Sequence, residues 1–285
     1  MSTATLDHHS SGKALGSKKK RRWAKYVLPT YTVLMMFYLA APIMVLILFS
    51  FNDIAGERNV PEWKGFTLHW WQDMFGQQDL NQSLKVSLLI APTAAFAAAI
   101  LGALIGLALG RYRFKGRGFT EFILFIAIAV PEIVLASGLA NMFLSVIPFN
   151  QIPKGFWTIW ASHVGFTIAF VAVTVRARVS GLDRSMEDAA QDLYATPLVT
   201  FFKVTLPLIL PGIVAGFILA FVLSLDDFVI TNFVAYQTKT YPIWVYGATR
   251  IGIPPQVNVF GTIMFSFGVI LAVVNALLQR RTKTR

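Results

Sequence analysis

The chain has 285 residues, of which 55% are apolar and only 14% carry a charge. Soluble domains carry a charge on about a quarter of their residues, so this balance and the mean hydropathy of +0.60 exclude an ordinary soluble protein and predict an integral membrane protein. The chain contains no cysteine, which excludes disulfides, thiolate metal sites and cysteine nucleophiles.

The N-terminal segment, residues 1–25, is polar, serine-rich and basic, and contains a Lys-Lys-Lys-Arg-Arg run at 18–22. It has too few apolar residues to build a core, so we expect a disordered cytoplasmic tail. Such a run also occurs in nuclear-localisation and nucleic-acid-binding segments. Its position directly before an apolar span favours a cytoplasmic topology anchor instead.

The remainder, residues 26–285, predicts one all-α membrane domain with six transmembrane helices. Each apolar span is near the roughly 20 residues that cross a bilayer. The first span is too long for the apolar region of a signal peptide and has no cleavage site at its end. The predicted spans are 27–51, 86–110, 119–147, 156–175, 208–228 and 259–278.

The distribution of basic residues predicts the orientation of these spans. With the N-terminus inside, the inner segments hold 19 of the 25 Lys and Arg residues. Both termini and the connection at about 176–207 are then expected on the cytoplasmic side. The net charge of +11 is thus an orientation signal and needs no nucleic-acid partner.

Two features along the first half of the chain point to packing or docking. The first outer loop carries Trp63, Trp70 and Trp71, which suit either the membrane–water interface or a docking surface for an external partner. The second span places glycines one helical turn apart, a spacing that lets two helices pack closely in lipid. These glycines are Gly102, Gly106 and Gly110. The basic connection 111–118 that follows is expected near anionic lipid.

Motifs of soluble enzymes are absent from the sequence. It contains no phosphate-binding P-loop, no H-E-x-x-H zinc motif and no G-x-S-x-G nucleophile motif. His69 and His163 stand apart from any evident ligand partner, so we expect satisfied polar residues there. No catalytic or metal site is predicted, and energy for transport has to come from a partner or a gradient.

Acidic residues inside apolar spans are candidates for a solute pathway, because charge in lipid is expensive. Glu132 follows Pro131 in the middle of the third span, where the proline should loosen the helix. Asp226 and Asp227 lie at the outer end of the fifth span and could form an electronegative mouth for a cationic solute. The alternatives for this pair are helix-end solvation or bonds to Asn232 or Arg250.

The stretch 185–212 is a polar, partly acidic island among the apolar runs. Acidic side chains flank Ala189 and Ala190, a composition that predicts a short exposed helix which another surface can approach closely. A mostly apolar half then leads to Pro207 and Pro211.

This stretch resembles the cytoplasmic coupling loop of bacterial ABC-importer permeases, E-A-A, three residues, Gly, nine residues, Ile-x-Leu-Pro. The sequence 188–190 fills the first part and 204–207 closes the motif at the same spacing. Asp188 and Val204 are conservative departures. Tyr194 stands where the family has Gly, and since that glycine often takes a positive φ, the loop is expected to turn differently here. The resemblance implies ATPase-coupling roles for Glu187, Asp188, Ala189, Ala190, Asp192, Tyr194, Thr196, Leu206 and Pro207.

Further stretches resemble the spermidine/putrescine permease subunits. They are spread over nearly the whole chain after residue 25 and lie at 50–52, 65–70, 111–116, 162–166, 171–178, 223–229 and 252–258. The resemblance implies the type I architecture of an importer permease in the bacterial inner membrane, and transport of polyamines by alternating access. It also implies four partners: a homologous second permease, a cytoplasmic ATPase dimer that binds ATP and Mg, an extracytoplasmic solute-binding protein and membrane lipid. No cofactor is expected in this chain.

Three alternatives remain open at this stage. The same fold could import another small solute, such as an amino acid, an opine, an anion or an iron complex. A secondary transporter would need no ATPase but predicts inverted repeats and paired broken helices, which the sequence does not display. A membrane anchor without transport is disfavoured by the intramembrane Glu132.

Overall fold

The computed structural model describes residues 20–54, 62–146 and 154–283. Regular structure in these ranges is helical, with one isolated bridge between Asn52 and Phe66. Most of the predicted N-terminal tail, residues 1–19, lies outside the described residues. Helix α1 begins at Lys20, so the last residues of that tail are helical, which suits the high helix propensity of Lys and Arg.

The chain divides into two compact units, Met1–Met74 with Pro254–Arg285, and Phe75–Ile253. The first unit contains α1 (Lys20–Phe49), α2 (His69–Gln72) and α12 (Gln256–Lys283). Within it α1 packs on α12, where the side chain of Leu46 lies over Gly261. Ile54, Trp70 and Val259 form its buried cluster.

Two of the three loop tryptophans pack inside this first unit. The Trp70 ring is buried, and its Nε1 donates a hydrogen bond to the Asn52 carbonyl oxygen at 3.0 Å. Trp71 stacks on Phe51 with ring centroids 5.3 Å apart. Trp63 keeps 46% of its surface exposed. Trp70 therefore lies neither at the membrane–water interface nor on an exposed docking surface. Its indole holds the loop against the rest of the first unit.

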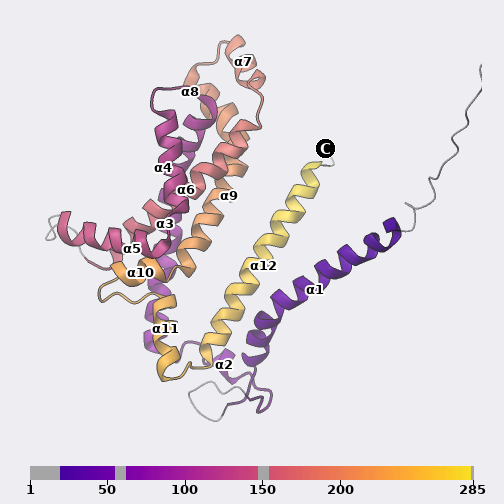
Figure 1. Ribbon diagram of the computed structural model, residues 1–285, viewed down its shortest axis with the longest axis vertical. Coiled ribbons are helices and arrows are strands. Elements are labelled where there is room, and N and C mark those ends of the chain that lie inside the picture. The colour runs from indigo at the N-terminus through magenta and orange to yellow at the C-terminus, as the bar shows by residue number, and fades with distance from the viewer. Residues whose placement is uncertain (1–19, 55–61, 147–153, 284–285) are drawn as a thin grey trace, which may run out of the picture. The chain divides into compact units, whose positions relative to one another are not determined.

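The second unit is built around α3, α6 and α9, which run side by side (Figure 1). Its elements are α3 (Gln78–Arg111), α4 (Arg117–Ala129), α5 (Glu132–Asn141), the π-helical turn η1 (Met142–Val146), α6 (Phe156–Ser180), α7 (Ser185–Asp192), α8 (Pro197–Thr200), the π-helical turn η2 (Phe201–Thr205), α9 (Leu206–Asp226), α10 (Val229–Val234) and α11 (Tyr241–Ile251). In Figure 1, α7 and α8 lie at the same end of this unit as the start of α4, and α11 lies at the opposite end.

The predicted glycine stripe is confirmed as the place where α3 and α6 meet. A Cβ atom on Gly102 would lie 2.6 Å from the Val171 Cβ, and one on Gly110 would lie 2.5 Å from the Val179 Cγ1. At Gly106 the obstacle is backbone, the Ala172 carbonyl oxygen at 2.6 Å. Only hydrogen atoms fit in this seam, so the two helices approach more closely than larger residues would allow.

The count of six spans is not confirmed. Among the described residues, four helices are long and apolar enough to cross a membrane: Tyr26–Phe49, Gln78–Arg111, Phe156–Ser180 and Pro197–Asp226. A fifth arises if Arg117–Ala129 and Glu132–Ser145 are counted as one broken span. The apolar part of α12 that is described, Gln256–Ile270, is shorter than a span.

The third predicted span is wrong as a continuous helix, because α4 and α5 meet at an angle of 106°. Val130 ends α4 in an extended conformation, with φ −65° and ψ 132°. The ring of Pro131 disfavours helical backbone at the preceding residue, which accounts for the break. Glu132 therefore begins a new helix instead of lying in the middle of one.

The glycine seam gives a test of this packing. We expect Gly106→Ala to destabilise the protein by about 2 kcal/mol, because the new methyl group meets backbone that cannot move aside. Thermal unfolding in detergent measures the effect. Gly247→Ala on α11 is the matched control, since nothing lies within 4 Å of the added atom. Equal melting temperatures for the two variants would contradict the close approach of α3 and α6.

Candidate functional site

The predicted coupling segment folds as two short helices at one end of the second unit. Asp183 lies two residues before the first of them, and its Oδ1 accepts a hydrogen bond from the amide of Ser185, the first residue of α7, at 3.1 Å. This bond lowers the pKa of the Asp183 carboxyl below its ordinary value. Thr196 caps α8 by accepting a bond from the Val199 amide, and Pro197 occupies the first turn. None of the residues of α7 is buried, as a short exposed helix requires.

Glu187 points from α7 into the protein. Its Oε1 lies 3.2 Å from Arg111 Nη2 and accepts a hydrogen bond from the Thr205 hydroxyl at 2.9 Å. The Arg111 side chain is only 7% exposed and donates a further bond to the Leu182 carbonyl oxygen at 3.1 Å. Arg184 in turn donates to the Arg111 carbonyl oxygen. These bonds join the ends of α3, α6, α7 and η2 into one polar latch.

The expectation that the basic connection lies near anionic lipid is wrong for Arg111, which is buried. Its guanidinium is buried because Glu187 supplies the compensating charge from a position far along the chain. In the sequence, Arg111 stands at the border between an apolar run and a basic run, and nothing there indicates that Glu187 is its partner. The pairing could only be found from the packing of α3 against the α6–α7 connection.

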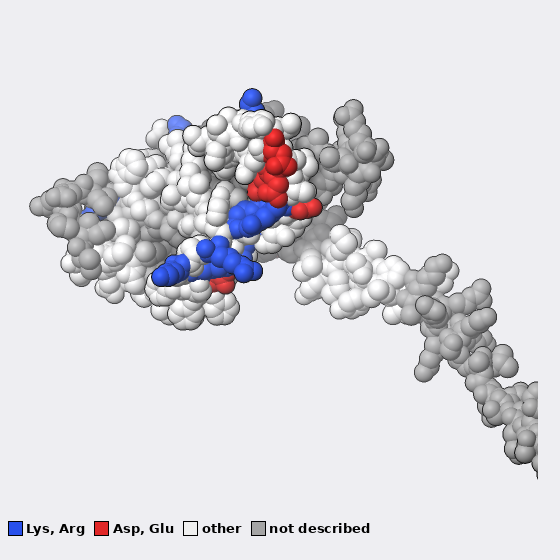
Figure 2. All heavy atoms as spheres, turned by 90° about the horizontal axis from the view of Figure 1, so that it is seen from above, with Lys and Arg blue, Asp and Glu red and all other residues white. Residues whose placement is uncertain are grey.

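The other acidic side chains of α7 and several apolar ones of the segment face outward, whereas Leu206 packs against the core. Asp188, Ala189 and Asp192 are exposed, while Ala190 is half-buried. Large apolar side chains lie among them, with Leu193 81% exposed and Leu198 71% exposed. Viewed from this end of the unit in Figure 2, a strip of acidic side chains lies beside a group of basic ones. The surface combines charge with uncovered apolar groups, as a protein docking surface does.

Tyr194 adopts the left-handed backbone conformation, with φ 61°. Its amide donates to the Gln191 carbonyl oxygen at 2.9 Å, and the Ala195 amide donates to Ala190 at 3.1 Å, which ends α7 in a tight turn. The expectation that the loop would avoid positive φ here is wrong, since the tyrosine takes the conformation that a glycine would favour. Its side chain is 97% exposed, so the strain is offset by these backbone bonds and not by packing of the ring against the described part of the chain.

The three candidate pathway carboxylates lie at two helix breaks in the middle of the second unit. Glu132 is the first residue of α5, and Asp226 is the last of α9. Asp227, the residue directly after α9, has an extended backbone conformation and is only 6% exposed. The Glu132 carboxyl group lies close enough to Asp226 and Asp227 to interact with both. The fold therefore brings together the acids that the sequence separates by more than 90 positions.

Of the three acids, Glu132 and Asp226 are exposed and Asp227 is buried. Asp227 bonds to neither Asn232 nor Arg250, the partners considered from the sequence; its partners are His163 and Thr231. The prediction that His163 is a satisfied polar residue is confirmed, because both ring nitrogens have partners. Ser224 is the fourth member of this cluster. In the sequence, the only signs of this cluster are a lone histidine and an aspartate in apolar spans.

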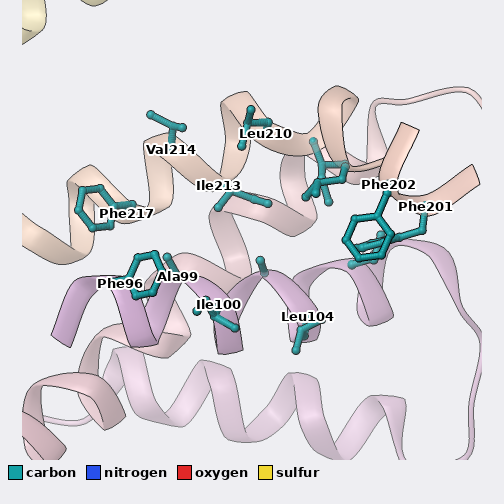
Figure 3. A pocket seen from close by; sticks show the side chains of 14 residues that line it. Phe96, Ala99, Ile100, Leu104, Phe201, Phe202, Leu210, Ile213, Val214 and Phe217 are labelled. Carbon is teal, nitrogen blue, oxygen red and sulfur yellow. The ribbon is translucent and has the colours of Figure 1, made fainter. Parts of the chain in front are cut away.

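An apolar groove of about 590 Å³ runs between α3 and the η2–α9 segment (Figure 3). All fourteen side chains that line it are hydrocarbon, among them Phe96, Ile100, Phe201 and Phe217. It offers no acceptor that could replace the hydration of an ammonium group, so it does not suit a cationic solute. Its end near Phe202 adjoins the coupling segment.

Comparison with known proteins places the chain in a family. Residues 102–284 match the model of the family described as "binding-protein-dependent transport system inner membrane component". The spermidine/putrescine transport system permease protein PotC of Haemophilus influenzae is 37% identical over 86% of this chain and 93% of its own length. The putrescine transport system permease protein PotI of Escherichia coli K12 is 36% identical over 87% of this chain and 89% of its own length.

Solved structures show the same fold at lower identity. A bacterial alginate ABC transporter, in complex with an alginate pentasaccharide-bound periplasmic protein, contains a chain that matches with a TM-score of 0.65 at 17% identity. The match covers 91% of this chain and 93% of that one. The MetNI methionine ABC transporter in an inward-facing conformation matches with a TM-score of 0.58 at 19% identity, over 72% and 96% of the two chains.

These matches and the apolar helices agree on a multi-pass membrane protein that acts in transport. The family model covers well over half of the chain, and the permeases quoted above match it along most of their length. The chain therefore belongs to the family of binding-protein-dependent transport system inner membrane components.

Proposed function

We propose that this chain is the membrane permease subunit of an ATP-driven importer and that its cargo is a polyamine. The observation that carries the proposal is the pairing of an exposed coupling surface on α7–α8 with a cluster of carboxylates at the helix breaks of the same unit. Relatives that are 36–37% identical are named as spermidine/putrescine and putrescine permeases, which supports the same class of cargo here.

The carboxylates suit a polyamine by charge. Each ammonium group that leaves water needs a negative partner in the pathway, and an anion would need basic groups instead. Glu132 and Asp226 are exposed beside the buried Asp227, so an ammonium group that reaches them relieves the repulsion between neighbouring carboxylates. The apolar walls of the helices would contact the methylene stretches between the ammonium groups.

The coupling surface suits a cytoplasmic ATPase as its partner. On this proposal the chain itself holds no nucleotide, and the partner ATPase dimer binds ATP and Mg. Closure of the dimer would move α7, and the latch from Glu187 to Arg111 would pass that movement to the end of α3. The surface has to bind the ATPase with different affinity in its two states, because equal affinity would shift no population.

The remaining partners follow from the same proposal. An extracytoplasmic binding protein delivers the polyamine, and a second, homologous permease subunit completes the pathway. The chain lies in the lipid of a bacterial inner membrane with both termini on the cytoplasmic side. The arrangement of basic side chains supports this orientation, since Arg111, Arg117, Arg176 and Arg184 lie at the α7 end of the second unit.

Cross-linking tests the docking surface. Single cysteines at Ala190 or Thr196 should cross-link to the ATPase in the assembled transporter, because both positions lie on the coupling segment, and the chain has no cysteine of its own. A cysteine at Lys115, an exposed position on the neighbouring connection, is the matched control. Cross-links from Lys115 together with none from the two test positions would place the ATPase elsewhere.

Tyr194 separates backbone strain from docking. Tyr194→Gly removes a left-handed tyrosine and should stabilise the isolated subunit by about 1 kcal/mol. The same change should weaken ATPase binding, because the exposed ring is the kind of side chain that anchors an interface. Thermal unfolding and a quantitative pull-down measure the two effects.

Two further variants control this experiment. Tyr194→Phe keeps the ring and should bind the ATPase as the natural chain does. Tyr194→Asn tolerates the left-handed backbone but lacks the ring, so it should bind as weakly as the glycine variant. Undiminished binding by both ring-free variants would show that Tyr194 does not anchor the interface.

Neutralising the exposed carboxylates tests the cargo pathway. Glu132→Gln combined with Asp226→Asn should reduce uptake of radiolabelled spermidine by about tenfold or more, because each removes a negative partner for an ammonium group. Subunit assembly should be unchanged, since both side chains are exposed. Glu62→Gln is the control, an exposed acid that pairs with Lys64 in the first unit. Normal uptake by the double variant would remove these carboxylates from the pathway.

A further inference from the structure

A buried polar cluster ties three helices of the second unit together beside the carboxylates. His163 comes from α6, Ser224 from the last turn of α9 and Thr231 from α10, while Asp227 is the residue directly after α9. His163 is 1% exposed and Thr231 is fully buried. Groups of this polarity are stable inside an apolar unit only when their hydrogen bonds are satisfied together.

The contacts in this cluster fit the tautomer of His163 that carries its proton on Nε2. The Thr231 amide and hydroxyl both lie within hydrogen-bond distance of Asp227 Oδ2, at 2.8 Å and 2.5 Å. Because the hydroxyl hydrogen is used there, the Thr231 oxygen accepts from His163 Nε2–H at 2.9 Å. His163 Nε2 is also 3.1 Å from Asp227 Oδ2. The other ring nitrogen, Nδ1, then accepts from the Ser224 hydroxyl at 2.6 Å.

This arrangement holds Asp227 by only one of its two oxygens. Oδ2 receives the bonds from His163 and Thr231, whereas Oδ1 makes no hydrogen bond to the described part of the chain. Glu132 interacts with the same carboxylate. Asp226 precedes it directly, at the break between α9 and α10. The cluster thus fixes the turn on which the exposed acid Asp226 is carried.

We propose that His163 is a positioning residue for the cargo pathway. This inference deepens the proposed function and rests on it. Through Oδ2 the imidazole and Thr231 fix the rotamer of Asp227 and the α9–α10 break, so that the carboxylates of Asp226 and Glu132 are held at one place for an ammonium group. His163 does not contact the cargo, because it is buried behind Asp227.

A purely structural role for the cluster makes a different prediction. Loss of a buried hydrogen bond that only stabilises the fold lowers the amount of assembled transporter and its melting temperature. It leaves the KM for the cargo unchanged in the molecules that assemble. A positioning role raises KM, because the carboxylates are no longer aligned in every molecule.

The test is uptake of radiolabelled spermidine by the complete transporter in proteoliposomes, with its ATPase and binding protein. His163→Leu removes both ring contacts and should raise KM by about tenfold. Ser224→Ala is a milder change, because it removes only the hydrogen bond at His163 Nδ1. It should raise KM by roughly threefold. His163→Gln can still accept from Ser224 and donate to Asp227, so it should restore a KM near that of the natural protein.

Thr167→Val is the matched control for this series. Thr167 is fully buried one turn further along α6, and its hydroxyl donates only to the carbonyl oxygen of His163 in the same helix. It should leave KM unchanged. In an Asp227→Asn background, His163→Leu should raise KM no further, because the histidine acts through that carboxylate.

An unchanged KM in both His163→Leu and Ser224→Ala would overturn the proposal, and so would independent, additive effects of His163→Leu and Asp227→Asn. If His163→Leu does not assemble, the other variants decide. A raised KM in Ser224→Ala, beside KM values near normal in His163→Gln and Thr167→Val, supports the proposal, and an unchanged KM in Ser224→Ala overturns it. The Glu132→Gln, Asp226→Asn double variant distinguishes the two levels of inference. A normal KM in that variant rejects the carboxylate pathway, whereas a raised KM there with normal histidine variants rejects only the positioning role.

Discussion

The close packing of α6 against α3 and α9 is the constraint on which the second unit depends. In lipid no apolar burial drives helices together, so their association needs backbones that approach within van der Waals contact. Val171 and Val179 of α6 fit over glycines of α3, and Gly216 of α9 receives Val171 from the other side. Helix α6 is therefore held between two neighbours along much of its length. It carries His163 near its start and Arg176 near its end, so one helix connects the carboxylate cluster with the coupling end.

Charge at the ends of this packed core is compensated inside the protein. Arg111 is buried against Glu187 at one end, and Asp227 is buried against His163 and Thr231 near the other. Breaking a buried pair by removing one partner is costly, since the remaining group keeps its desolvation penalty. Both networks therefore specify where short helices sit: the first fixes α7, and the second fixes the step from α9 to α10. The two exposed acids are Asp226 and Glu132, and Glu132 also interacts with the buried Asp227. Both remain available to a solute on the proposed mechanism.

Features that depend on local composition could be predicted from the sequence, and features that depend on distant partners could not. The long apolar runs, the exposed coupling helix and the seam at Gly102 follow from residues close together in the chain. Pro131 predicts a loosened helix. The sharp angle between α4 and α5 could not be predicted, because it depends on the extended backbone conformation that Val130 adopts. His163 and Ser224 are 61 positions apart, and no periodicity relates them. The positive φ of Tyr194 could not be predicted either, because the short backbone bonds that end α7 outweigh the preference of one residue.

The π-helical turn η2 makes the connection between α8 and α9 sensitive to its length. A π turn contains one residue more than an α turn, so the helix faces before and after it are offset by about 100° relative to an unbroken helix. Leu198 before the turn faces outward, while Ile209 after it is buried in the core. Removal of a single residue from Phe201–Thr205 would restore regular winding and rotate α8 by that angle against the fixed face of α9. Insertions and deletions in this stretch should therefore be selected against more strongly than substitutions. The rotation of α8 about the helix axis relative to α9 sets the direction in which the coupling surface faces.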